Sequence, residues 1–316
     1  MNLSQIKLLI ELNRLDFNLS AASEAMHIVQ SAGTRQLKLL EEELNLAIFE
    51  RKGKRLTGFT ETGSKILQQA EQMLLAQNNI TNIALDFHQP QVAHLKIACT
   101  HTQAKYFLPQ KLVAFKRSHP KVKVHIEQGT PKQLVNWVQQ GQVDLAISTE
   151  ALDDCVQLTK IDCYNWHHVL VIPNGHALID APLSLNVIAD YPILTYMAGM
   201  TGQGKILQAF KDAGLTLEVD LYATDSDVIK DYVRLGFGVG IIAEMAIDPK
   251  LDADLTTLNL TPWISQCTTK VGFLSNRYLP SFVHDFIKLI SSRSLSENSE
   301  PTAGKLNLAI FPPNFR

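Results

Sequence analysis

The sequence predicts an α/β protein in three parts: a helical N-terminal module, one long helix, and a larger region of alternating strands and helices. Three observations carry this prediction. Apolar residues recur at helical spacing through the first 60 residues, repeat every seven residues between 60 and 86, and gather in strand-like runs between helical ones from residue 92 onward. The 316 residues suffice for about two domains with cores of their own.

Composition excludes several classes of protein. Hydrophobic residues make up 46% of the chain, which rules out wholesale disorder. Lys and Arg number 29 against 31 Asp and Glu, so the net charge of -2 excludes a basic coat over the whole surface but not a local basic patch. Four scattered cysteines without a CxxC pair argue against a disulfide scaffold, and we predict no metal site. The chain begins with an amphipathic helix rather than an export signal, and no apolar run approaches about 20 residues, so we expect a cytoplasmic protein without membrane contact.

Residues 1–59 predict a winged helix-turn-helix. Ile6 and Leu9 mark a first helix, and Asn18 or Ser20 can cap a second. A tight break before residue 30 separates the second helix from a third, which is the helix-turn-helix pattern. The basic stretch 49–57, with a central glycine, predicts a small hairpin, or wing.

Residues 60–87 predict one long linker helix, with Thr60 or Thr62 as its cap. Ile66, Met73 and Ile80 lie seven residues apart, which is a coiled-coil spacing. We interpret the segment as a dimerisation helix; the alternative is a helix that packs on its own domain.

From residue 92 the strand-helix-strand order predicts parallel β-sheets. We expect the strands at 95–100, 122–129, 144–149, 169–173, 192–196, 218–224, 239–243 and 269–274, and the helices at 104–117, 131–140, 204–213, 225–235 and 280–290.

Two crossings of the chain, near 163–166 and near 267, divide this region into two lobes. We place lobe 1 at about 92–163 and 268–291, lobe 2 at about 164–267, and the whole bilobed domain at 88–291. The tail 292–316 is rich in Ser, Glu, Asn and Pro, and is predicted to be flexible. Clefts between lobes bind small ligands.

The third helix and the wing carry the residues that can contact nucleic acid. Gln and Arg make bidentate hydrogen bonds to base edges, hydroxyls reach bases or phosphates, and clustered cations grip the backbone. A solvated charge run on a helical bundle is the alternative for the wing alone. The predicted DNA-binding residues are Gln30, Ser31, Thr34, Arg35, Lys38, Arg51, Lys52 and Lys54.

A second group of polar residues lies where strands end and helices begin. Ligands of α/β sheets bind at the carboxyl ends of strands, and a helix N-terminus favours an anion. Any one of these threonines could instead be a helix cap. The predicted ligand-binding residues are Thr100, Thr102, Gln103, Thr149, Trp166 and Thr201.

The remaining motifs are weak. The glycine-rich run 236–240 follows a helix and precedes a strand, so it predicts a helix stop rather than a nucleotide loop. His167 and His168 form the one adjacent histidine pair, for which a surface or capping role is favoured over metal binding. No nucleophile motif or other convergent catalytic set stands out, so we predict no catalytic residues and no enzyme.

One set of residues in the N-terminal module forms a recognisable pattern: Ala21, Ala22, Gln30, Leu40, Glu41, Leu44, Phe49 and Arg51. In these residues the module resembles the DNA-binding module of LysR-type transcriptional regulators. The chain departs from the family pattern at Val29, Ser31, Asn45 and Ile48.

The resemblance extends to about residue 291 and is strongest with the activators of the cysteine regulon. It is carried by the segments 100–104, 128–131, 147–152, 223–230 and 232–240. It implies a bilobed effector domain like that of periplasmic binding proteins, with no cofactor. The implied inducer is N-acetylserine or O-acetylserine, with sulfate as an anion of the same site. The implied partners are double-stranded DNA, RNA polymerase and further copies of the chain, as a dimer or tetramer.

The function that this resemblance implies is control of sulfur assimilation and cysteine biosynthesis genes. A sister regulator of sulfate-starvation genes, for alkanesulfonate or taurine use, shares most of the segments and is the alternative. A transporter's solute-binding protein would have an export signal and no DNA-binding head, and an α/β enzyme would need a convergent acid, base or nucleophile.

Overall fold

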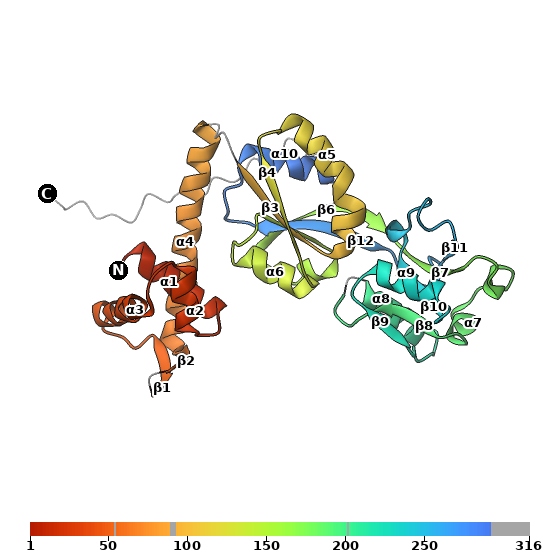
Figure 1. Cartoon of the computed structure of the whole chain (residues 1–316), viewed down its shortest axis with the longest axis horizontal. Helices are drawn as coiled ribbons and strands as arrows, with labels where there is room; N and C mark the ends of the chain where they lie inside the picture. Colours follow the sequence, from red (N-terminus) through yellow and green to blue (C-terminus); the bar gives the residue numbers. More distant parts are fainter. Residues whose placement is uncertain (54, 89–92, 201, 292–316) are drawn as a thin grey trace. The chain divides into compact units, whose positions relative to one another are not determined.

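A computed structural model of the chain describes residues 1–53, 55–88, 93–200 and 202–291 (Figure 1). The described chain forms two compact units. The first takes in residues 1–93 with the short segments 140–142 and 274–281, and the second takes in the rest. The predicted tail at 292–316 and residues 54, 89–92 and 201 lie outside the described residues.

The N-terminal module of the first unit is the predicted winged helix-turn-helix. Its helices are α1 (Leu3–Arg14), α2 (Leu19–Ala25) and α3 (Gln30–Leu44), and its hairpin is β1 (Phe49–Lys52) with β2 (Arg55–Phe59), paired antiparallel. Asn18 caps α2, because its side chain accepts a hydrogen bond from Ala21 N at 3.1 Å. The helices share a core of buried aliphatic side chains that includes Leu9, Leu12, Leu37 and Leu40.

The long helix α4 (Glu61–His88) begins against this module. Thr60 caps it, since Gly63 N donates to Thr60 Oγ1 at 2.9 Å. Gly63 is needed at this point because a Cβ there would lie 2.0 Å from the carbonyl oxygen of Ile48. Ala70 is buried in the core of the module, whereas Met73 and Ile80 further along α4 are exposed.

The segment 274–281 lies against the second half of α4. Asn82 Nδ2 donates to the carbonyl oxygen of Tyr278 at 3.1 Å, and the hydroxyl of Tyr278 donates to Asp86 at 2.7 Å. Asp86 also accepts hydrogen bonds from Ser281. Polar contacts therefore tie the chain between the last strand and the last helix to α4.

The second unit contains two five-stranded sheets, which define its two lobes. The first-lobe sheet has the order β4-β3-β5-β12-β6. Figure 1 shows helices α5 and α10 on one side of it and α6 on the other. Its elements are β3 (His94–Cys99), α5 (Leu108–Ser118), β4 (Lys123–Gln128), α6 (Pro131–Gln139), β5 (Leu145–Ser148), β6 (Leu158–Trp166), β12 (Cys267–Leu274) and α10 (Ser281–Ile290).

The second-lobe sheet has the order β11-β7-β10-β8-β9. Its core gathers apolar side chains of the strands and of both main helices, among them Phe210 of α8 and Ile229 of α9. The elements are β7 (His168–Pro173), α7 (Leu185–Ala189), β8 (Ile193–Tyr196), α8 (Gln203–Asp212), β9 (Leu221–Ala223), α9 (Ser226–Arg234), β10 (Val239–Ala243) and β11 (Leu255–Asn259).

The predicted parallel pairing is present in both sheets, but each sheet also contains antiparallel strands. Strand β3 pairs in parallel with β4 and β5, and β8 with β9 and β10, but β12 runs antiparallel to β5 and β7 antiparallel to β10 and β11. The antiparallel strands follow from the two passages between the sheets, from β6 to β7 and from β11 to β12. Because a strand that arrives from the other sheet needs no crossover helix, it can enter in either direction.

None of the helices in the described ranges combines the length and the hydropathy that a bilayer-spanning helix needs.

Candidate functional site

The exposed face of α3 carries the five residues predicted to read DNA. Leu37 and Leu40 are buried on the opposite face, which turns this one to solvent. Gly33 allows α3 to approach α2 closely, since a Cβ there would lie 2.5 Å from Ser23 Oγ. The exposed residues are Gln30, Ser31, Thr34, Arg35 and Lys38.

Local contacts hold some of these side chains. Ser20 Oγ donates to Gln30 Oε1 at 3.0 Å, and Thr34 Oγ1 donates to the carbonyl oxygen of Gln30 at 3.0 Å. Lys38 Nζ lies 3.4 Å from Glu42 on the next turn. The amide nitrogen of Gln30 and the guanidinium of Arg35 have no partner among the described residues, so both can donate to a ligand.

The basic residues of the wing are of two kinds: exposed residues without a described partner, and one arginine that forms an ion pair within the N-terminal module. Lys52 is exposed at the end of β1, and Lys54 lies outside the described residues. Arg51 Nη2 instead lies 2.6 Å from Glu41 Oε2 of α3. The structure thus ties Arg51 to the module itself, a structural role that the charge pattern did not predict.

Glu41 is the residue that joins the wing to α3. Its Oε1 atom accepts hydrogen bonds from the backbone N–H groups of Ile48 and Phe49, at 2.9 and 3.2 Å. Its other oxygen holds Arg51. The position of the wing beside the reading helix therefore depends on one carboxylate.

Replacing Glu41 by alanine should destabilise the N-terminal module. The change leaves two backbone donors and Arg51 without their acceptor, which costs about 1–3 kcal/mol. Chemical denaturation of the full chain measures this loss of unfolding free energy. Glu42→Ala removes a carboxylate from the same helix without these contacts and should cost less than about 0.5 kcal/mol. Equal effects of the two variants would contradict the assignment.

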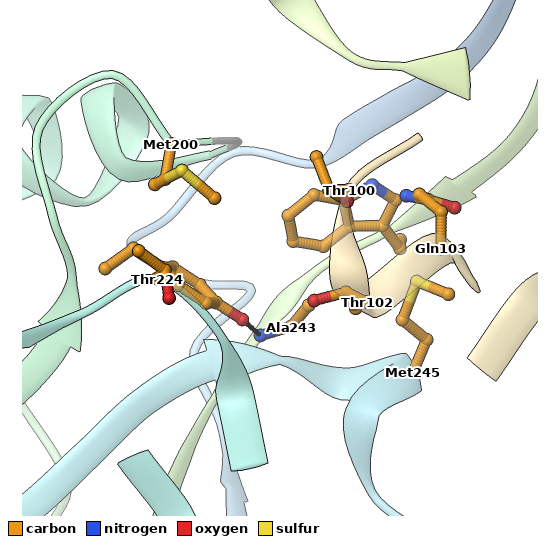
Figure 2. Close-up of a pocket in the computed structure, with 9 residues that line it drawn as sticks. Thr100, Thr102, Gln103, Met200, Thr224, Ala243 and Met245 are labelled. Atoms are coloured by element: carbon orange, nitrogen blue, oxygen red, sulfur yellow. Dashed lines mark hydrogen bonds between the residues drawn. The ribbon is translucent and has the colours of Figure 1, made fainter. Parts of the chain in front are cut away.

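A pocket lies between the two lobes of the second unit (Figure 2). First-lobe residues from the end of β3 and the helix after it face residues from the carboxyl ends of β8, β9 and β10 in the second lobe. The lining residues are Thr100, Thr102, Gln103, Trp166, Tyr196, Met200, Thr224, Ala243 and Met245.

Four of the six predicted ligand-binding residues line this pocket: Thr100, Thr102, Gln103 and Trp166. Thr149 does not, and Thr201 lies outside the described residues. The hydroxyl of Thr149 is nevertheless buried and without a hydrogen-bond partner among the described residues.

Five lining residues were missed: Tyr196, Met200, Thr224, Ala243 and Met245. Tyr196 and Ala243 end strands β8 and β10, and Thr224 follows β9 directly. The rule that ligands bind at the carboxyl ends of strands was applied to the first lobe only. Applied to the second lobe, it would have found these three; no sequence signal marks the two methionines.

Thr102 is not a helix cap. It opens the π-helix η1 (Gln103–Phe107), which runs on into α5, and its side chain makes no capping hydrogen bond. In Figure 2 Thr102 faces the residues of the second lobe. Its hydroxyl is therefore available to a ligand, beside the free backbone N–H groups of the first helical turn.

A buried hydrogen-bond network fixes Gln103. The hydroxyl of Tyr164 donates to Gln103 Oε1 at 2.5 Å, and Gln103 Nε2 lies 3.5 Å from Thr269 Oγ1. Trp166 Nε1 donates to the same Thr269 oxygen at 3.1 Å. The pocket wall made by Gln103 and Trp166 is thus preorganised by two residues behind it.

In the second lobe, the hydroxyl of Tyr196 likewise fixes the pocket wall through hydrogen bonds. Its oxygen accepts a hydrogen bond from Ala243 N at 2.9 Å and lies 2.7 Å from Ser226 Oγ. Burial raises the pKa of Tyr196 to about 12, so the phenol stays neutral.

His168 is buried, which contradicts the predicted surface or capping role. Its side chain is fully shielded from solvent, neither ring nitrogen has a partner among the described residues, and the ring lies against Trp166 with centroids 4.9 Å apart. Gly202, at φ +79°, comes so close that a Cβ would lie 2.7 Å from His168 Nε2. Burial lowers the pKa of His168 from near 6.5 to about 3, helped by the nearby charge of Lys205.

The pH dependence of stability should reveal His168. The folded protein keeps this imidazole neutral, while the unfolded chain protonates it below pH 6.5, so the unfolding free energy falls as pH drops from 6.5 toward 3. The expected slope is up to about 1.4 kcal/mol per pH unit. His168→Gln should remove this slope between pH 6.5 and 4.5 in denaturant titrations, whereas His167→Gln, at the half-buried neighbour, should keep it. An unchanged slope in His168→Gln would show that the imidazole is accessible to protons.

The chemistry of the pocket suits binding of a small polar molecule. Its lining contains hydroxyls, one amide, two thioethers and aromatic surface, and none of the nine residues is charged. The partial positive charge of a helix N-terminus is the feature that favours an anion here. Buried thiols nearby are not reactive, because burial raises the pKa of Cys99 and Cys163 to about 12.

Comparison with known families gives two matches. The "Bacterial regulatory helix-turn-helix protein, lysR family" matches residues 3–64, and the "LysR substrate binding domain" matches residues 88–294. Together they cover both parts of the chain where the reading helix and the pocket lie.

Full-length relatives are transcriptional regulators. The chain is 40% identical to SsuR of Burkholderia cenocepacia, over 98% of this chain and all of the relative. It is 38% identical to CysB of the same organism, over 92% of this chain and 93% of the relative. It is 36% identical to cbl of Escherichia coli, over 95% of this chain and 98% of the relative.

Solved structures agree on the fold. The cofactor-binding domain of the Cbl transcriptional regulator is 36% identical and superposes with a TM-score of 0.62, over 64% of this chain and 90% of that domain. Full-length OxyR from Pseudomonas aeruginosa superposes with a TM-score of 0.70 at 19% identity, over 93% of this chain and 99% of OxyR. CbnR in complex with its target DNA superposes with a TM-score of 0.60 at 18% identity, over 92% of this chain and 99% of CbnR.

Proposed function

The chain belongs to the LysR family of bacterial transcriptional regulators, and we propose that it controls genes of sulfur assimilation and cysteine biosynthesis in response to an acetylated serine. The observation that carries the proposal is the pocket between the lobes, uncharged and rich in hydroxyls, in a chain 38% identical to a CysB protein. The site of action is the cytoplasm, where DNA and the metabolite meet.

DNA is read by α3. Gln30 and Arg35 offer free donors on an exposed helix face, which is the arrangement that reads base edges in a major groove. Ser31, Thr34 and Lys38 lie on the same face and bind bases or phosphates. Lys52 and Lys54 of the wing hold the phosphate backbone.

Two copies of the chain pair through α4. The apolar side chains of Met73, Ile80 and Ile83 are exposed along this helix. An exposed apolar stripe on a long helix is typical of a surface that packs against another helix. A dimer presents two reading helices to successive major grooves, and a tetramer is a pair of such dimers. Contact with RNA polymerase follows for an activator of this family.

N-acetylserine or O-acetylserine fits the pocket chemistry. The carboxylate takes the first helical turn after Thr100, with the hydroxyl of Thr102 and the amide of Gln103 as further donors. Trp166 and the thioethers of Met200 and Met245 offer apolar surface to the acetyl methyl group. Thr149, whose buried hydroxyl has no partner among the described residues, and Thr201 stay further candidates for ligand contact, and sulfate occupies the anion position alone.

A regulator of alkanesulfonate or taurine use is the second candidate, because SsuR is as similar to the chain as CysB. The two candidates differ in the effector. Calorimetric titration of the full chain with N-acetylserine, O-acetylserine and sulfate separates them. Binding of an acetylserine supports the first, and binding of sulfate without either acetylserine supports the second. Absence of heat with all three overturns the effector assignment.

A further inference from the structure

Asp227, at the start of α9 in the second lobe, contacts three polar side chains of the first lobe. Tyr106 donates its hydroxyl to Asp227 Oδ1 at 2.5 Å, Lys105 Nζ lies 2.9 Å from the same oxygen, and His101 Nε2 lies 3.1 Å from Oδ2. All three donors come from the helix that begins after β3. One carboxylate thus bridges the two lobes.

The bridge is anchored by a buried lysine. Lys230 is 3% exposed, and its Nζ donates to Tyr106 Oη at 3.0 Å, to Asp252 Oδ2 at 2.7 Å and to the carbonyl oxygen of Ala246 at 2.8 Å. Tyr106 therefore accepts from Lys230 and donates to Asp227, both of the second lobe. A buried ion pair of this kind specifies one arrangement of its partners, because removing a member leaves a buried charge uncompensated.

The bridge and the pocket share the same two segments of chain. Thr102 and Gln103 of the pocket lie two to four residues before Lys105 and Tyr106, and Thr224 of the pocket lies three residues before Asp227. The shared segment of the first lobe is the π-helix η1, a helix type that is rare and frequent at functional sites. Any change in the angle between the lobes must break or form these contacts.

A metal ion does not explain the cluster. His101, Asp225 and Asp227 do place ligand atoms within 4.8 Å of one another. The ammonium groups of Lys105 and Lys230 already neutralise Asp227, however, and Asp225 caps α9 by accepting from two backbone N–H groups. Burial acts to raise the pKa of Asp227, but the hydrogen bonds from Lys105, Tyr106 and His101 outweigh it and hold the pKa below its usual range.

We propose that Asp227 is a positioning residue for effector binding, which holds the lobes closed around the pocket through Tyr106, Lys105 and His101. The inference rests on the proposed function of the pocket. The apparent affinity for a ligand scales with the fraction of molecules in the binding-competent state. Loss of the bridge lowers the closed fraction and weakens binding without touching a residue that lines the pocket.

Effector affinity of variants of the full chain tests the proposal, with N-acetylserine as the probe in calorimetry. Asp227→Asn keeps the size of the side chain and removes its charge, and should weaken binding at least tenfold. Tyr106→Phe removes the hydrogen bonds to Asp227 and from Lys230 but keeps the contacts of Lys105 and His101, and should weaken binding two- to fivefold. Asp231→Asn, one turn further along α9, where the side chain pairs with Arg234, should stay within twofold. Asp227→Asn within twofold of the unchanged protein would overturn the proposal.

Hydrogen exchange without any effector tests the bridge independently. In Asp227→Asn the amides of 101–107 and 226–230 should exchange at least tenfold faster, while those of α6 keep their rates. Unchanged exchange in both segments would overturn the bridge. If N-acetylserine does not bind the unchanged protein, the assigned effector fails, and the exchange comparison alone decides the role of Asp227.

Discussion

Replacing both Gln30 and Arg35 by alanine is expected to abolish most of the discrimination between operator and random DNA. Each bidentate contact to a base contributes about 1–3 kcal/mol of discrimination, so the loss of two amounts to roughly 30-fold or more. Both side chains are exposed on α3 and carry free donors, so the double variant keeps its fold.

Fluorescence anisotropy with a duplex selected from a random pool measures the effect against a scrambled duplex. Arg14→Ala is the matched control, since it removes one arginine from α1 of the same module, where Arg14 pairs only with Glu11. The control should lose little affinity for either duplex. A double variant that keeps the full ratio between the two duplexes would remove α3 from base recognition.

Replacing Thr102 by leucine is expected to abolish the response to effector while DNA binding persists. The larger apolar side chain enters the pocket and replaces a hydroxyl that makes no capping bond. Overpacking costs about 1–3 kcal/mol, and an unpaired polar group of the ligand costs about 1–3 kcal/mol more. Roughly 2–6 kcal/mol in total corresponds to an affinity loss of about 30- to 25,000-fold.

Calorimetry with N-acetylserine measures this loss. Thr102→Ser keeps the hydroxyl and should retain affinity within a few-fold, and Thr257→Leu makes the same change at an exposed position of β11 and should have no effect. Should Thr102→Leu bind the effector as well as Thr257→Leu does, Thr102 lies outside the site.

Local patterns predicted the N-terminal module well because its contacts are local. Asn18 and Thr60 cap the helices that they precede in sequence, and the wing hairpin closes over a few residues. The role of Arg51 could not be read in this way, because its partner Glu41 lies on another element. A charge run shows which residues are basic and not which of them are already paired.

The second unit shows where such reasoning ends. Three of the nine pocket residues lie at strand ends of the second lobe, and the antiparallel strands come from passages between the sheets. Both are features of topology rather than of local sequence. His168 illustrates the limit most clearly. A polar residue beside a second histidine suggests a surface, yet β7 is buried along its length and carries His168 inside.

The measurement that tests the account most directly is DNA binding by the full chain with and without N-acetylserine, on the selected duplex. Binding of a metabolite between the lobes and reading of DNA by α3 must be coupled for the chain to act as an effector-controlled regulator. The account predicts that N-acetylserine changes the affinity or the footprint on that duplex and that Thr102→Leu removes this change. Identical binding curves and footprints with and without N-acetylserine, for a protein that demonstrably binds it, would contradict the account.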